Sequence, residues 1–150
     1  MRSQDIKQIN GIWCIAFAAE AGSLKSVNSE RVVPVHPALQ DDGFLKFAAS
    51  VRNGPLFADV ARDRFDSRGG IATKILSNWI RSLGITDERI APNHSWRHRF
   101  RTLGRSYGIA VDVLDAMTGH ASKTEGDRYA VVLPDAMMLE LSKIPKLEVG

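Results

Sequence analysis

The chain has a single cysteine, Cys14, and little continuous apolar sequence. One cysteine excludes an internal disulfide. The longest apolar stretch, residues 12–19, is far shorter than the roughly 20 residues that a membrane-spanning helix needs. The chain does not open on a basic and apolar leader either, so we expect a cytoplasmic protein without a membrane partner. Because Cys14 lies inside the apolar stretch, we interpret it as a small buried hydrophobe rather than a reactive thiol.

Repeats and low-complexity linkers are also absent from the sequence. Its 150 residues are 44% hydrophobic and 25% charged, which is ordinary for a globular protein. That length and apolar share suit one hydrophobic core, so we expect a single domain.

Acidic residues are missing from one stretch of the chain. The net charge is only +3, but residues 89–105 contain five arginines and two histidines and no acid. A local positive field of this kind suits a phosphate backbone. A solvated helix face is the alternative, and charge alone favours it.

Three short runs rich in β-branched or aromatic residues predict strands at residues 11–17, 24–27 and 31–35. Turn-forming residues separate the runs, so they predict a small three-stranded antiparallel meander. Pro34 indicates that the third strand lies at an edge, because proline cannot donate a hydrogen bond to a neighbouring strand.

Most of the remaining sequence has the apolar spacing of helices. The expected helices cover residues 37–51 with a break near Gly43, 70–83 with Gly84 as a cap, 94–106, 111–117, 123–129 and 135–142. Residues 58–68 are charged and weakly periodic, which indicates a surface loop. A small sheet followed by helices makes an α+β domain.

Four features carry candidate chemistry: Lys25, the pair His94 and Arg97, the pair Gly119 and His120, and Tyr129. His94 and Arg97 are three apart, so on a helix their side chains project from one face and can reach a common anion. Taken singly, each feature also has a plain structural interpretation. These are a capping histidine with a surface arginine, a hydrogen-bonded histidine at a turn, and a packed tyrosine.

Taken together, these residues resemble the tyrosine recombinase and phage integrase family. The similarity is carried by His94-Ser-Trp-Arg97, then Gly119-His120, then Tyr129 nine residues later. Upstream, Leu24-Lys25-Ser26 and the segment Val33-Pro34-Val35-His36-Pro37 resemble the hairpin that carries the family's catalytic lysine. The resemblance covers roughly residues 5–129 in matching order and spacing.

The resemblance implies a DNA breaking-rejoining fold and site-specific DNA recombination or integration through a 3′-phosphotyrosyl intermediate. Arg97 would bind the non-bridging phosphate oxygens, with His94 and His120 completing the cradle. Tyr129 would be the nucleophile and Lys25 the general acid for the departing 5′ oxygen. The covalent ester conserves the bond energy, so we expect no cofactor and no metal.

Double-stranded DNA is the implied partner, and the protein would then be nucleoid-associated. Arg99, Arg101 and Arg105 are candidates for phosphate contacts, and a solvated face is equally consistent. The C-terminal segment 133–141 resembles the helix through which the family self-associates on DNA, and a helix covering its own core is the alternative.

One family element has no counterpart ahead of Asp5, namely the helix with the first catalytic arginine. Arg2 lies too close to the first strand to be that residue. We therefore expect residues 1–150 to be a partial, truncated catalytic domain that also lacks the family's N-terminal DNA-clamping domain. Losing one guanidinium from a phosphate clamp costs about 100-fold or more in rate, so this chain is expected to be weakly active or inactive.

Three other histidine and aromatic features have plainer interpretations. Trp96 and Phe100 lie at helical spacing and are expected in the core. His98 with His94 forms an i, i+4 pair, but no third ligand has zinc spacing. His36 is expected to be structural. Two rival functions remain open, a non-catalytic DNA-binding remnant of an integrase and an unrelated helical domain whose histidines bind a metal.

Overall fold

The computed structural model describes residues 1–18, 30–120 and 132–147. The chain forms two compact units, which are described separately. The first unit comprises Met1–Leu56 and Leu103–Gly150, and the second unit comprises Phe57–Thr102. No helix among the described residues is both long and apolar enough to cross a membrane.

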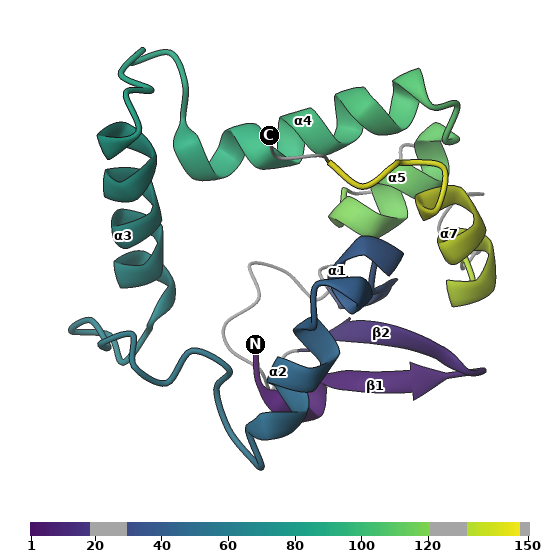
Figure 1. The fold of residues 1–150 in the computed structure, drawn as a ribbon, viewed down its shortest axis with the longest axis horizontal. Helices are drawn as coiled ribbons and strands as arrows, with labels where there is room; N and C mark the ends of the chain where they lie inside the picture. The colour runs from purple at the N-terminus through teal and green to yellow at the C-terminus, as the bar shows by residue number, and fades with distance from the viewer. Residues whose placement is uncertain (19–29, 121–131, 148–150) are drawn as a thin grey trace. The chain divides into compact units, whose positions relative to one another are not determined.

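The first unit contains a three-stranded antiparallel sheet in the order β1-β2-β3, formed by β1 (Ile6–Ile9), β2 (Ile12–Phe17) and β3 (Arg31–Pro34). Figure 1 shows β1 and β2 as adjacent antiparallel arrows. A small three-stranded antiparallel sheet is confirmed, but its strands differ from the predicted ones. The strand β1 was missed, and β2 pairs directly with β3, whereas the predicted meander placed the run at residues 24–27 between them. That run lies outside the described residues.

A tight turn at Asn10-Gly11 explains why β1 forms despite its few apolar residues. Both residues have positive φ, 50° and 80°. This is the requirement of a two-residue hairpin turn, which Asn-Gly meets with little strain. The Asn-Gly pair is therefore the sequence signal that predicts β1.

The register of β2 and β3 pairs Cys14 with Pro34 and Ile15 with Val33. Within the described part of the sheet β3 is an outer strand, as Pro34 predicted. Cys14 is fully buried, and burial raises the pKa of its thiol, with the charge of Asp135 adding to the effect. The interpretation of Cys14 as a buried hydrophobe is confirmed.

The described helices are α1 (Pro37–Asp41), α2 (Phe44–Ser50), α3 (Gly69–Ser82), α4 (Pro92–Ser106), α5 (Val111–Thr118) and α7 (Pro134–Leu141). Gly43 adopts a left-handed conformation with φ 86° and separates α1 from α2, as expected. The predicted helix at residues 94–106 begins instead at Pro92, because proline is well suited to a first helical turn. The fold class is α+β, as predicted.

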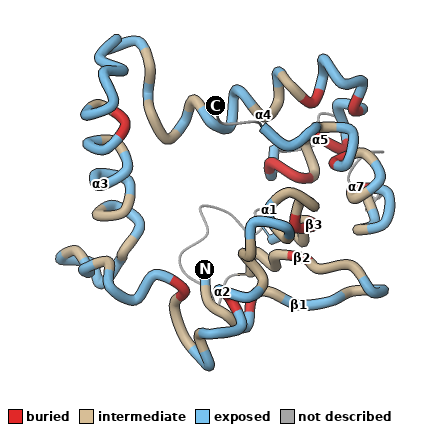
Figure 2. Tube along the Cα trace, in the orientation of Figure 1, coloured by how far each residue is buried: buried red, intermediate tan, exposed pale blue. Residues whose placement is uncertain are grey.

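The core of the first unit lies between the sheet and the helices α5 and α7. Leu114 of α5 and Val35 after β3 are fully buried, and Met137 and Leu141 of α7 are nearly so. Figure 2 shows buried positions on α5 and next to β3. The helix α7 contacts β2, β3 and α5, so it covers the core of its own chain.

His36 links the first helix to the C-terminal segment. Its Nδ1 accepts a hydrogen bond from the Ala38 amide (3.0 Å), so Nε2 carries the proton and donates to the Ile144 carbonyl at 2.8 Å. Lys146 also pairs with Asp42 after α1. The structural interpretation of His36 is confirmed.

The second unit buries few of its apolar side chains. Ile80 is its buried hydrophobic residue, whereas Trp79 of α3 and Trp96 of α4 are 56% and 57% exposed. Phe100 is intermediate. The prediction that Trp96 is a core residue is therefore wrong, and Ile75 and Leu76 of α3 are exposed as well. Residues 58–68 contain no helix or strand, as expected of a surface loop.

Candidate functional site

The Gly119-His120 pair forms the C-terminal cap of α5. Gly119 follows the last helical residue and has φ 68° and ψ 38°. The amide of His120 donates to the Asp115 carbonyl at 3.0 Å. A left-handed residue followed by this backward hydrogen bond is a common helix ending that favours glycine. The structure thus confirms that His120 lies at a turn after a helix.

The Thr118 hydroxyl determines which nitrogen of the His120 ring carries a proton. Oγ1 of Thr118 donates to the Leu114 carbonyl at 2.6 Å. Its single proton is then used, so the 2.7 Å contact between Oγ1 and Nδ1 of His120 is a bond that Nδ1–H donates. In the neutral ring the lone pair lies on Nε2. Nε2 can then accept a proton or, once protonated, donate to an anion.

Arg31 of β3 contacts the end of α5 next to this turn, and sequence reasoning did not single it out. Its Nε donates to the Met117 carbonyl at 3.1 Å, and its guanidinium carbon lies 4.2 Å from the centre of the Phe17 ring. A cation next to the last carbonyls of a helix is stabilising. Because Arg31 and Met117 are 86 positions apart, no local pattern predicts their contact.

The helix α4 carries the His94 and Arg97 pair in the second unit. Both side chains are exposed, and their spacing on a regular helix places them on one face, as predicted. The ring of His98 meets that of His94 edge to face, with centroids 4.5 Å apart. Arg101 lies one further turn along the same face.

Arg99 and Arg105, the other predicted DNA contacts on α4, differ from Arg101. Arg99 is five positions beyond His94, which is about 140° around the helix, so it faces a different side. Arg105 is exposed in the last turn of α4, which belongs to the first unit.

At the start of the basic stretch, Arg89 is paired with an acid. Its Nη2 lies 2.7 Å from Oδ2 of Asp87, and the hydrogen bonds from Arg89 hold the pKa of Asp87 below its ordinary value. Asp87 lies just outside the acid-free stretch. Arg89 therefore contributes less free positive charge than its sequence position indicates.

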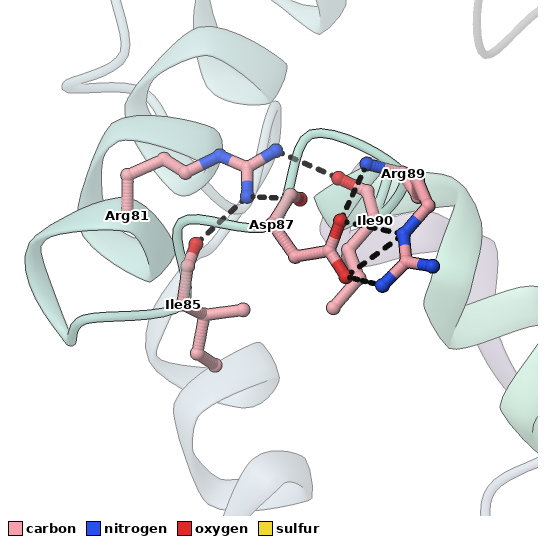
Figure 3. Close-up of polar contacts among 5 residues, drawn as sticks. All are labelled: Arg81, Ile85, Asp87, Arg89 and Ile90. Carbon is pink, nitrogen blue, oxygen red and sulfur yellow. Dashed lines mark hydrogen bonds and ion pairs between the residues drawn. The ribbon is translucent and has the colours of Figure 1, made fainter.

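Arg81 organises the loop that leads into α4. Its guanidinium donates to the carbonyls of Ile85, Asp87 and Ile90 at 2.7 to 2.8 Å. Figure 3 shows Arg81 reaching across the loop and the neighbouring pair of Asp87 and Arg89. Asn93 of α4 also donates to the Thr73 carbonyl of α3 at 3.0 Å, so both helices of the second unit are tied to each other.

Lys25 and Tyr129 lie outside the described residues. The residues that flank their segments are described. Phe17 and Arg31 are the last paired residues of β2 and β3, and Arg31 contacts the end of α5 just before His120. His94 and Arg97 belong to the second unit and are described apart from it.

Arg2 has a structural role. Its Nε and Nη2 donate to Oδ1 of Asp5 at 3.0 and 2.7 Å. Burial would raise the pKa of Asp5, but the hydrogen bonds and charge of Arg2 outweigh it, so this pKa lies below its ordinary value. Among the residues that the structure describes, no group of three histidine, cysteine or acidic side chains is arranged to hold a metal ion.

No protein family model matches the chain, and no match is found among curated proteins or among solved structures. A functional assignment therefore depends on the residues of this chain themselves.

Proposed function

We propose that this chain carries catalytic residues of a tyrosine recombinase, an enzyme that cuts one strand of double-stranded DNA and rejoins it to another. The order His94-x-x-Arg97, Gly119-His120 and Tyr129 supports this proposal. The observation that carries it is the Gly119-His120 turn. There the Thr118 hydroxyl holds Nδ1 of His120 and leaves the lone pair on Nε2, on an exposed side chain.

In the proposed reaction the Tyr129 hydroxyl attacks the phosphorus of a DNA phosphodiester. The Tyr129 oxygen forms a bond to phosphorus, the bond from phosphorus to the 5′ oxygen breaks, and Lys25 gives that oxygen a proton. Nε2 of His120 accepts the phenol proton. Arg97 and His94 donate hydrogen bonds to the non-bridging oxygens, where negative charge develops. Attack by a second 5′ hydroxyl reverses these steps and rejoins the strand.

DNA binding in this proposal depends on α4. His94, Arg97 and Arg101 share one exposed or half-exposed face, and three such residues one turn apart can follow a run of phosphates. Arg99 and Arg105 are secondary candidates. The same face also supports the alternative function, a non-catalytic DNA-binding remnant that has kept the fold and lost cleavage.

Self-association on DNA through the C-terminal segment remains part of the proposal. The helix α7 buries Met137 and Leu141 in its own core, whereas Leu139 is 71% exposed. Leu139 is therefore the described side chain of α7 through which a second copy would bind.

Covalent capture on nicked DNA tests the function. Duplexes with randomised sequence around a nick, which lets the cleaved end diffuse away, are incubated with the protein, and adducts are isolated under denaturing conditions. Tyr129→Phe should abolish the adduct. The matched control is Tyr107→Phe, which removes the hydroxyl of the other tyrosine and should leave the adduct intact.

The outcomes separate the two functions. DNA binding without a Tyr129-dependent adduct supports the non-catalytic remnant. Absence of DNA binding at low salt, where phosphate contacts are strongest, contradicts both.

A further inference from the structure

We infer that Arg31 is a positioning residue for His120, acting on the backbone of the Gly119-His120 turn. The inference rests on the proposed function of His120. Its geometric part, that Arg31 determines where the turn lies, stands on contacts within the first unit alone.

The first contact is with the end of α5. The last carbonyls of a helix have no partner within the helix, and Nε of Arg31 donates to one of them, the Met117 carbonyl, at 3.1 Å. Met117 is two residues before Gly119. The guanidinium also lies over the Phe17 ring, which restricts its plane.

The second contact is with Gly119 itself. A Cβ atom built on Gly119 would lie 2.8 Å from Nη1 and 3.0 Å from Cζ of Arg31. The guanidinium therefore packs directly against the backbone of the residue before His120. The positive φ favours glycine there, and any larger side chain would also have to displace the Arg31 guanidinium.

Together with Thr118, Arg31 holds His120 at two points. The Thr118 hydroxyl holds the imidazole through Nδ1, and Arg31 holds the backbone one residue earlier. A lysine cannot make the same contacts, because a single ammonium cannot donate to Met117 while lying flat between Phe17 and Gly119. Charge alone is thus expected to be insufficient at position 31.

The simplest competing explanation is that Arg31 only stabilises the packing of β3 on α5. Arg2→Met is the control for a general loss of stability. It removes another half-buried arginine of the first unit, which pairs with Asp5 and not with the turn. A general loss of stability should affect both variants alike.

The decisive experiment is a double-mutant cycle in single-turnover adduct formation on the nicked DNA. Arg31→Met and His120→Ala should each slow the reaction by about 10- to 100-fold, and the double variant should be no slower than His120→Ala alone. Arg31→Lys should remain impaired. Multiplied effects in the double variant, wild-type rates in Arg31→Met, or an equal slowing by Arg2→Met would overturn the inference.

A second measurement does not depend on activity. The amide resonances of Gly119 and His120 should shift in Arg31→Met and stay unchanged in Arg2→Met. If they do not move in Arg31→Met, Arg31 does not hold the turn and the inference is wrong. If they move as expected while the wild-type protein forms no adduct, the proposed function fails and the geometric role of Arg31 is upheld.

Discussion

Thr118 and His120 share a 2.7 Å hydrogen bond in which the imidazole Nδ1–H is the donor, because the Thr118 hydroxyl gives its proton to Leu114. The two residues are separated only by Gly119, whose left-handed conformation turns the chain back toward α5. A helix end, a hydroxyl and a glycine thus determine the tautomer of the one histidine that the proposed mechanism uses as a base.

Thr118→Val should disturb the His120 ring with little effect on the fold. The substitution preserves volume but removes the acceptor of Nδ1–H, at a cost of about 1 kcal/mol in the free energy of unfolding. The rate of adduct formation should fall by roughly tenfold. Without the bond to Thr118, the imidazole spends less time in the orientation and tautomer in which Nε2 can accept the phenol proton. Thr118→Ser, which keeps the hydroxyl, is the control. Nitrogen chemical shifts of His120 report the tautomer, and an unchanged tautomer population in Thr118→Val would contradict the assignment.

Gly119→Ala should destabilise the first unit more than the same change at Gly108. Both glycines have positive φ, 68° and 74°, so each alanine incurs about 1 kcal/mol or more of backbone strain. Only at Gly119 does the new Cβ also meet a neighbour, Nη1 of Arg31 at 2.8 Å, whereas Gly108 has nothing within 4 Å. Urea denaturation measures the difference. The difference in destabilisation between the two alanine variants should disappear when Arg31→Met is also present. Equal losses in the free energy of unfolding at both glycines would argue against close packing by Arg31.

Gly104→Ala should destabilise the protein although alanine is the better helix former. An added Cβ would lie 2.5 Å from Cδ2 of Leu114, which is fully buried and cannot easily move away. Overpacking of this kind costs about 1–3 kcal/mol, which exceeds the roughly 1 kcal/mol gained in helix propensity. The control is Gly69→Ala at the start of α3, where the nearest atom is at an ordinary 3.6 Å. Thermal unfolding should show a lower midpoint for Gly104→Ala only.

Acid should remove a stabilising contribution of Asp5. Its folded-state pKa lies below the ordinary value of 3.8, because the bonds from Arg2 outweigh the effect of burial. The contribution is therefore fully present above that ordinary value and is lost as the pH falls through the lower pKa of the folded state. Asp5→Asn should be less stable than wild type at neutral pH, and the difference should shrink as acid is added. Urea denaturation across this pH range measures it, and a constant difference would show that the charge of Asp5 is not responsible.

Sequence patterns predicted those parts of the fold that depend on neighbouring residues. The break at Gly43, the cap after α5 and the edge position of Pro34 all follow from local backbone chemistry. The strand β1 was missed although Asn10-Gly11 signals it.

Contacts between distant segments could not be predicted, because side-chain periodicity does not show which elements meet. In the candidate site, the clearest such contact is the hydrogen bond from Arg31 to the Met117 carbonyl. In the fold, the clearest failure is Trp96, which was expected in the core and is exposed. The order of the candidate catalytic residues, by contrast, is a property of the sequence alone, so the roles of Lys25 and Tyr129 stay predictions.

Arg101→Gln should weaken DNA binding in a manner that depends on salt. Arg101 lies on the same face of α4 as His94 and Arg97, where the proposal places the DNA phosphates. Because Arg101→Gln removes one phosphate contact, it should reduce the slope of log affinity against log salt concentration by about one. Arg62→Gln is the control, because it removes one positive charge from a loop of the same unit that lies outside α4, and it should leave the slope unchanged. Arg99→Gln should have a smaller effect than Arg101→Gln, because Arg99 faces another side of the helix. Fluorescence anisotropy with a labelled duplex at several salt concentrations measures all three. An unaltered slope in Arg101→Gln would exclude this face of α4 as the DNA contact and would leave the positive stretch as a solvated helix surface.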